Sequence, residues 1–431
     1  MYLRRVHIQN VRSIAELTWE LPPDVGGAGW HVILGDNGAG KSSFLRSIAL
    51  ALVGPSEAAG LRQSWQEWLR AGSAEGRIVL DVVRDPDHDG LLVDRPTPAP
   101  IVSFKTTLTA VGPSARNLFA PIAAAFDSSI FESLWGSPRG WFSASYGPFR
   151  RFTGGDKDFE KLFYSQPKLA RHLSVFGEAV ALTEALTWLQ SLKFKTLEGN
   201  AEGNLLAPIL TFVNQVGFLP HGVHLEDVTS SGVDFVDASG FKVPVQNLSD
   251  GYRSVLSMTF ELVRQMALTY GPAGLFSEDH TRIVRPGVVI VDEIDAHLHP
   301  TWQRTIGVWF RKHFPNVQFI VSTHSPLICQ AAEVGSVFRL PQPGSEPAED
   351  RGEMVKGVAL NRLLYGNVLD AYGTGVFGDG VTRSDSAVEK LDRLAELNTQ
   401  ELVDHLTDEE RGEQADLRAI LPTDASVTQT P

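Results

Sequence analysis

A glycine-rich stretch between an apolar run and a helical pattern constrains this chain most. Residues 35–42 read GDNGAGKS, which fits the pattern G-x-x-x-x-G-K-[ST] in full. Glycines let backbone N–H groups surround phosphates, and the N-terminus of the following helix adds partial positive charge. The lysine of such a loop, here Lys41, reaches the β- and γ-phosphates, and the hydroxyl of Ser42 binds Mg²⁺. The predicted nucleotide-binding residues are Asn37, Gly38, Ala39, Gly40, Lys41, Ser42 and Ser43.

The composition indicates a globular cytoplasmic protein. The 431 residues suffice for a full core and two or three lobes, and 43% of them are hydrophobic. No apolar run reaches the roughly 20 residues of a membrane-spanning helix, and the N-terminus does not resemble a signal peptide, so we expect no membrane partner. A single cysteine excludes an internal disulfide. The net charge of −13 argues against a surface that generally coats DNA, although residues 139–152 are locally basic and aromatic.

The hydrophobic pattern predicts an α/β fold. Residues 2–20 and 76–111 alternate as antiparallel strands do, whereas the runs at 287–300 and 317–326 are apolar at every position and suit central parallel strands. Residues 155–215 follow a helical pattern, most clearly at 169–192, and predict a lid or arm. Two helices are expected near the end of the chain, with capping boxes of Ser386 with Glu389 and of Thr407 with Glu410.

Acidic residues and a histidine follow the two central strands. Asp292 ends the run VVIVDEID and can hold Mg²⁺ opposite Ser42, while Glu293 can orient and polarise an attacking water molecule. His324, in STHSP, lies at the carboxyl end of the next run, where it can donate a hydrogen bond to a γ-phosphate. The alternative for His324 is a loop histidine beside Ser and Thr residues that cap a helix.

The segment LSDGYRS, residues 248–254, opens another helix. A hydroxyl from Ser249, backbone amides near Gly251 and the helix dipole would face outward together and form a second anion site. Because the glycine-rich loop already holds its own phosphates, this second site would meet the γ-phosphate bound by another subunit. The alternative is an ordinary N-cap, since Ser-Asp before a helix is common.

Taken in order, these motifs resemble those of ABC-type ATPase heads of the SMC/RecF/OLD branch. The matching segments are LRRVHIQNVRSI, GDNGAGKSS, LSDGYRS, VVIVDEIDAHLHP and STHSP. More narrowly, the chain is similar to the compact AAA family ATPases of bacterial defence loci, which serve Septu-type, PARIS-type and some retron systems. The resemblance implies a P-loop ATPase head with an N-terminal antiparallel part, a central mostly parallel sheet and a helical lid or insert.

The resemblance also implies how the site is assembled. Two heads would dimerise head-to-tail around two ATP molecules, and Asp295 would carry contacts between the two sites. Each site would combine Ser249 and Gly251 of one chain with five residues of the other. Those five are Lys41, Ser42, Asp292, Glu293 and His324, of which Lys41, Glu293 and His324 would be catalytic while Ser42 and Asp292 bind Mg²⁺.

Two departures from the family pattern bear on function. Asp250 and Tyr252 stand where the signature usually has a glycine and a glutamine, and an acidic Asp250 would weaken closure or make it depend on a partner. The segment SASYGPFRR, residues 143–151, occupies the place of the glutamine loop. The roles of Tyr146 and Arg150 in it are open, and a plain turn is the alternative.

The leading hypothesis is an ATP-hydrolysing switch subunit of an anti-phage defence complex. It would form an ATP-dependent homodimer or higher oligomer and control a separate effector, either a nuclease or another toxin. The expected segments are two halves of the ATPase head at 1–150 and 246–340, an insert at 151–245 and a docking tail at 341–431. The alternative is a RecF-like repair clamp that binds nucleic acid through Arg139, Arg150 and Arg151, and a third option is a transporter ATPase.

Overall fold

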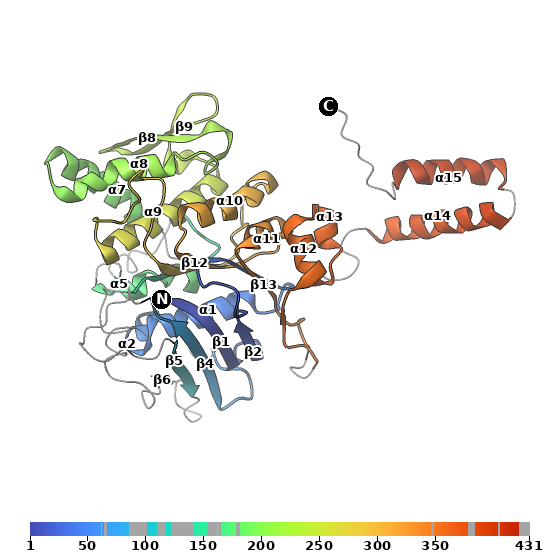
Figure 1. The fold of residues 1–431 in the computed structure, drawn as a ribbon, viewed down its shortest axis with the longest axis horizontal. Helices are drawn as coiled ribbons and strands as arrows, with labels where there is room; N and C mark the ends of the chain where they lie inside the picture. The colour runs from blue at the N-terminus through green and yellow to red at the C-terminus, as the bar shows by residue number, and fades with distance from the viewer. Residues whose placement is uncertain are drawn as a thin grey trace. The chain divides into compact units, whose positions relative to one another are not determined.

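The computed structural model describes most of the chain and divides it into two compact units, residues 1–366 and 367–431. Figure 1 shows the ribbon. Arg139 and part of the predicted helical region at 155–215 lie outside the described residues. The described residues are 1–61, 63, 67–85, 101–109, 118–121, 141–152, 162, 165–177, 182–345, 349–377, 384–403 and 406–421.

An antiparallel sheet forms the N-terminal part of the first unit, as the alternating pattern predicts. Its strand order is β2-β1-β4-β5-β6. Alternate side chains of β1, among them Leu3, Val6 and Ile8, are fully buried, which is how a strand with one face on the core behaves. The strands are β1 (Tyr2–Val11), β2 (Ile14–Glu20), β4 (Glu75–Val83), β5 (Ile101–Thr109) and β6 (Leu118–Pro121).

The second sheet is mostly parallel and has the order β14-β13-β3-β12-β11-β7. Every pairing is parallel except that of β13 with β14. The predicted central strands β11 and β12 are neighbours and are buried at every position, which confirms the expected fold class. The strands are β3 (Gly29–Leu34), β7 (Ser143–Tyr146), β11 (Gly287–Val291), β12 (Val317–Ser322), β13 (Gly335–Arg339) and β14 (Glu353–Met354).

Helix α1 (Lys41–Val53) lies between these two sheets. It contacts β1 and β4 of the antiparallel sheet and β7, β11 and β12 of the parallel sheet. Apolar side chains from Phe44 to Val53 are therefore buried around the whole helix, and both faces contribute to one core. The helix that starts at the glycine-rich loop is thus fixed from two sides.

The predicted helix over residues 169–192 is interrupted. The structure has two short helices, α5 (Pro167–Ala170) and α6 (Leu173–Phe176), and the latter ends at Gly177 in an extended conformation. The continuous helical pattern resumes only in α7 (Glu184–Leu197). Apolar spacing alone therefore predicted one helix where the backbone turns.

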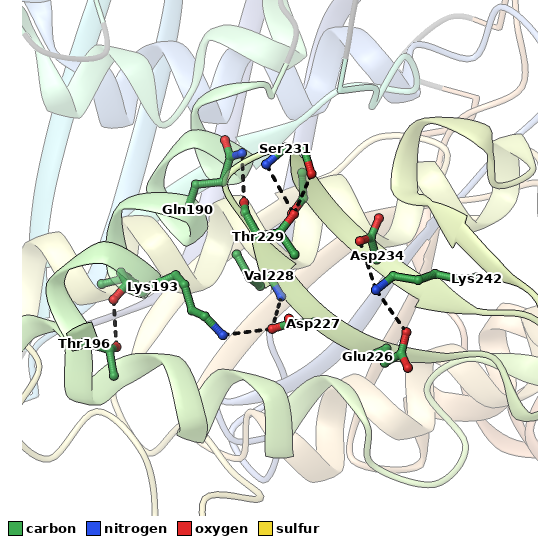
Figure 2. A network of polar contacts seen from close by, with 12 residues as sticks. Gln190, Lys193, Thr196, Glu226, Asp227, Val228, Thr229, Ser231, Asp234 and Lys242 are labelled. Carbon is green, nitrogen blue, oxygen red and sulfur yellow. Dashed lines mark hydrogen bonds and ion pairs between the residues drawn. The ribbon is translucent and has the colours of Figure 1, made fainter.

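Helix α7 packs against a small antiparallel sheet in a lobe that also contains α8 (Leu206–Val213). That sheet comprises β8 (His224–Thr229), β9 (Gly232–Val236) and β10 (Lys242–Pro244). Figure 2 shows the polar contacts that join these elements. Lys193 on α7 bonds Asp227 on β8 at 3.0 Å, and Lys242 on β10 lies 3.4 Å from both Glu226 and Asp234. Hydrogen bonding from Lys193 is the largest of the causes that lower the pKa of Asp227.

Helix α9 (Asp250–Tyr270) connects this lobe to the parallel sheet, and almost all of its length after Arg253 is buried. The remaining helices of the first unit are α2 (Pro55–Ala58), α10 (Pro300–His313), α11 (Pro326–Cys329) and α12 (Gly357–Tyr365). Short 3₁₀ turns are η1 (Ala59–Leu61), η5 (Ala201–Leu205), η6 (Pro220–Gly222), η7 (Val245–Asn247) and η8 (Gln330–Glu333).

The C-terminal unit contains α13 (Val368–Tyr372), η9 (Gly375–Phe377), α14 (Asp385–Val403) and α15 (Asp408–Ile420). Both predicted terminal helices are present, and the capping box of Thr407 with Glu410 is confirmed. The box of Ser386 with Glu389 is wrong, because the helix begins at Asp385 and Ser386 lies inside its first turn. The amides of Ala387 and Val388 bond the carbonyl of Ser384 instead. No helix in the described part of the chain is long and apolar enough to span a membrane.

A buried histidine makes the stability of this fold depend on pH. His31 on β3 is fully buried, with Nε2 2.9 Å from the carbonyl of Gly27 and Nδ1 3.0 Å from the hydroxyl of Ser336. Because a carbonyl only accepts, Nε2 carries the proton of a neutral ring. Burial lowers the pKa of His31 to about 4. In the unfolded chain His31 therefore binds a proton below about pH 6.5, whereas in the folded chain it stays neutral down to about pH 4.

We therefore predict that the free energy of unfolding falls as the pH drops from 7 to about 4. The contribution of His31 to this loss is about 3 kcal/mol. Urea unfolding at several pH values measures it, and His31→Gln should make the loss smaller by up to that amount. An unchanged pH dependence in His31→Gln would contradict the assignment.

Candidate functional site

The glycine-rich loop connects the end of β3 to the start of α1, as its sequence predicts. Gly40 has a φ of +95°, in the left-handed region that favours glycine. A Cβ at this position would also lie 3.1 Å from the hydroxyl oxygen of Ser13. The loop therefore keeps a backbone-lined cradle that any larger residue would narrow, and this cradle fits a row of phosphates.

Lys41 is the cation of this cradle. It is only 7% exposed, and its Nζ donates to the carbonyl oxygens of Gly35 at 2.7 Å and Asp36 at 3.1 Å. Burial lowers the pKa of Lys41, while the carboxylates of Asp292 and Glu293 partly offset that effect. The buried Lys41 cation thus shares the electrostatic environment of Asp292 and Glu293, which suits the binding of a phosphate together with a divalent cation.

Asp292 follows β11 and is almost fully buried. Its Oδ1 accepts a hydrogen bond of 2.5 Å from the hydroxyl of Ser322 at the end of β12. Among the described residues, its Oδ2 is buried without a hydrogen-bond partner. A buried carboxylate oxygen left open in this way suits a divalent cation. Asp292 and the hydroxyl of Ser42, half-buried at the start of α1, are the residues that fit Mg²⁺.

Glu293 has an unusual backbone conformation, with a φ of +47°. Its N–H donates to the same Ser322 hydroxyl oxygen at 2.8 Å, so one serine holds both acidic residues. Non-glycine residues with positive φ are uncommon and are often found where a side chain must be aimed. Sequence reasoning missed Ser322, although it precedes His324 in the STHSP segment.

His324 is exposed at the same edge of the sheet. Partial desolvation lowers its pKa, and the positive charge of Lys41 lowers it further, while Asp295 and Glu293 oppose the shift. Lys41, Asp292, Glu293 and His324 therefore share one electrostatic environment, as the sequence predicts. Near neutral pH the imidazole is uncharged and can donate one hydrogen bond.

Ser249 and Gly251 lie at the N-terminus of α9. Ser249 is exposed and, in the described structure, its side chain caps no amide of its own helix. A Cβ on Gly251 would lie 2.7 Å from the carbonyl oxygen of His297, in the loop that follows β11. The ordinary N-cap alternative is thus not realised, and the hydroxyl is available to another molecule.

Asp250 and Tyr252, the two residues that depart from the family pattern, each contact another residue of the chain. Asp250 forms an ion pair with Arg253 in the first turn of α9, so its negative charge is offset locally. The hydroxyl of Tyr252 donates to the carbonyl of Pro220 at 3.1 Å, and its ring lies 5.1 Å from that of Trp302. Tyr252 therefore anchors the segment to α10. It lacks the side-chain amide of the glutamine that the family pattern has at this position.

A pocket of about 250 Å³ adjoins the glycine-rich loop on the side of the antiparallel sheet. Residues 13–17, Gly38, Ala39 and residues 341–345 contribute to its lining. Its position beside the phosphate cradle suits the base and sugar of a nucleotide. The sequence did not single out residues 341–345, because no charge or motif marks them.

The first four residues of the SASYGPFRR segment form β7, and Tyr146 pairs with Val291, the residue before Asp292. Arg150 is only 4% exposed, so it cannot line a basic groove for nucleic acid, and that part of the repair-clamp alternative is wrong. Arg151 is exposed, and Arg139 lies outside the described residues.

Family comparisons agree with this geometry. The family described as "AAA domain, putative AbiEii toxin, Type IV TA system" matches residues 150–330. A second AAA domain family matches residues 5–78. Two separate parts of the chain are thus similar to AAA domain families. The two matched regions contain the glycine-rich loop, the LSDGYRS segment, the acidic pair and the STHSP segment.

The chain is similar to curated proteins of two kinds. It is 24% identical over 380 residues to the Septu protein PtuA of Bacillus mycoides, a match that covers 86% of this chain and 45% of that protein. It is 31% identical over 162 residues to the Retron Ec83 probable ATPase of Escherichia coli, covering 35% of this chain and 29% of the relative. The chain thus spans less than half the length of these relatives.

Among solved structures, the chain is similar to an Smc head bound to the C-terminal winged-helix domain of ScpA. The TM-score is 0.49 at 16% identity, and the similarity covers 82% of this chain and 98% of the other.

We predict that Ser322 controls the affinity of the site for Mg²⁺. Ser322→Ala removes the bond to Asp292 and the acceptor for the Glu293 amide, and loss of such a supporting contact weakens metal sites about tenfold or more. The Mg²⁺ concentration for half-maximal retention of ATP should rise about tenfold. Ser325→Ala is the matched control, because it deletes another hydroxyl of the STHSP segment, one that bonds Gln303 on α10. Equal Mg²⁺ dependence in both variants would remove Ser322 from this role.

Proposed function

We propose that this chain is an ATP-hydrolysing switch subunit that assembles around ATP and controls a separate effector in bacterial defence against phage. One observation carries the proposal. A single serine, Ser322, holds the Mg²⁺-ligand candidate Asp292 and the base candidate Glu293 opposite the lysine of the phosphate cradle.

Hydrolysis follows from these positions. Lys41 binds the β- and γ-phosphates, and Ser42 and Asp292 would hold Mg²⁺, which offsets phosphate charge when bound. Glu293 polarises the attacking water molecule and takes up its proton. His324, uncharged near neutral pH, donates a hydrogen bond to the γ-phosphate, while the backbone amides of Asn37, Gly38, Ala39, Gly40 and Ser43 complete the cradle.

Assembly around ATP is supported by the segment at the start of α9. The Ser249 hydroxyl is exposed at the N-terminus of α9 and makes no capping bond in the described structure, and the charge of Asp250 is offset by Arg253. These features suit the γ-phosphate held by a second chain. Asp295, in the loop after β11, has a buried Oδ1 without a hydrogen-bond partner in the described structure, and we assign it contacts between the two sites.

The defence role rests on homology. The similarity to the Septu protein PtuA extends over 86% of this chain, and the similarity to the Retron Ec83 probable ATPase extends over 35% of it. Because a switch subunit controls the activity of another protein, we propose an effector of the nuclease or toxin class. The unit at residues 367–431, which packs separately from the ATPase head, is the proposed docking part.

One purification tests the proposal. We predict that Glu293→Gln, tagged and purified from its host with ATP and Mg²⁺, hydrolyses ATP at least about 100-fold more slowly than wild type and accumulates as an ATP-bound dimer with a stoichiometric effector. Lys41→Ala should bind no ATP and remain unassembled. Mass measurement and protein identification provide the readout.

Equal nucleotide retention in wild type and Glu293→Gln would remove Glu293 from its catalytic role. Retention of DNA instead of a protein partner, with DNA-stimulated and salt-sensitive hydrolysis, would move the function to a repair clamp.

We also predict that Ser249→Arg blocks hydrolysis without blocking ATP binding, because the substitution occupies the face that meets the partner's γ-phosphate. Ser239→Arg, an equal substitution in an exposed turn between β9 and β10, is the control and should leave hydrolysis unchanged. Turnover and binding of a fluorescent ATP analogue separate the two effects. Full activity of Ser249→Arg would eliminate the shared-site arrangement.

A further inference from the structure

Arg150, in the loop after β7, is a buried cation whose contacts, as described, are all to neutral groups. Its Nη1 donates to the carbonyl oxygens of Gly147 at 2.9 Å and Asp292 at 2.8 Å. Its Nη2 donates to the carbonyl oxygen of Glu293 at 3.0 Å. Its Nε donates to the hydroxyl of Ser254 on α9 at 3.0 Å. One planar group therefore joins three separate segments of the chain.

On the side of the acidic pair, Arg150 fixes the backbone and not the carboxylates. The carbonyl of Glu293 bonds Arg150, and the N–H of Glu293 bonds Ser322. Both peptide groups that flank the left-handed Glu293 are thereby held, and this restricts the direction in which its carboxylate points. If Arg150 moves, the left-handed backbone of Glu293 loses the guanidinium bonds to the carbonyls of Asp292 and Glu293. The bonds from the Ala296 N–H to the Glu293 carbonyl and from the Glu293 N–H to Ser322 remain.

On the other side, Arg150 bonds the helix that carries the signature segment. Ser254 lies in α9, in the turn that follows Ser249 and Gly251, and its side chain is buried. Because α9 is one continuous helix of 21 residues, a shift of its exposed N-terminus displaces Ser254 with it. The guanidinium fork is rigid, so such a displacement reaches the Asp292 and Glu293 carbonyls directly.

Among the residues that the structure describes, no carboxylate forms an ion pair with Arg150. Burial lowers the pKa of Arg150 to about 10, and the nearby charges of Asp292, Asp295 and Glu293 partly oppose this effect. The guanidinium thus remains charged near neutral pH, and hydrogen bonds to a charged donor are stronger than those between neutral groups. A link of this kind is stiff enough to transmit a small displacement.

We propose that Arg150 is a positioning residue that couples the signature helix to the catalytic carboxylates, so that Glu293 is aligned only when the N-terminus of α9 is engaged by a second ATP-bound chain. This inference rests on the proposed function, in which that engagement occurs. In this inference, the SASYGPFRR loop couples contact of the second chain at the start of α9 to the position of Glu293.

The test uses Ser254→Ala, which removes only the signature-side contact. We predict that ATP affinity and ATP-dependent assembly stay within about twofold of wild type, while turnover of the assembled form falls about tenfold, or about 1.4 kcal/mol in the barrier. Ser257→Ala deletes a buried hydroxyl one turn further along α9 and is the matched control, with all three quantities unchanged. In a double-mutant cycle, adding Ser254→Ala to Arg150→Met should cause no further loss, because both act through one contact.

A second readout does not depend on hydrolysis. With a nonhydrolysable ATP analogue, amide hydrogen exchange at residues 291–298 should slow in the assembled wild type but not in assembled Ser254→Ala, whereas the start of α9 is protected in both. Wild-type turnover and protection in Ser254→Ala would overturn the coupling, as would additive losses in the cycle. A parallel fall in melting temperature, assembly and turnover would show a merely structural contact. A wild-type chain that neither hydrolyses ATP nor assembles would instead refute the proposed function.

Discussion

The parallel pairing of β3, β12 and β11 is the constraint on which the rest of the site depends. Val321 of β12 pairs with Val32 of β3 on one side and with Val291 of β11 on the other. Because parallel strands end at the same edge, this register brings the glycine-rich loop, the acidic pair and the STHSP segment together. A slip of one residue would turn Ser322 to the opposite face and separate it from Asp292.

The site keeps features that destabilise the fold locally. One oxygen of Asp292 is buried without a partner among the described residues, and Glu293 has a left-handed backbone. Each costs about 1–3 kcal/mol. The rigid surroundings of α1, fixed between two sheets, allow these costs to persist, and a bound cation would relieve the first of them. Strain and unmet polar groups concentrated at one sheet edge are typical of functional sites.

The sequence was sufficient for what is local and periodic. Loop glycines, buried strands and the acidic pair follow from spacing along the chain, and the structure places them as expected. It was insufficient where contacts join distant segments. Arg150 and Ser254 are 104 positions apart, and Arg150 and Asp292 are 142 apart, so no pattern could pair them. Locally, apolar periodicity carried the predicted helix through Gly177, and the capping box at Ser386 was misplaced because Ser384 starts that helix.

The altered signature segment shows how a departure from a family pattern can be compensated nearby. An aspartate in the first turn of a helix occupies the same positive field that would attract a phosphate. Alone, Asp250 would therefore compete with an anion at Ser249. Arg253, one turn along the same helix face, pairs with that carboxylate and keeps the added charge of the pair near zero. Tyr252 is held by Pro220 and Trp302, so the N-terminus of α9 keeps its orientation. In the proposed arrangement, the dipole of the helix would therefore attract the anion in place of the usual signature residues.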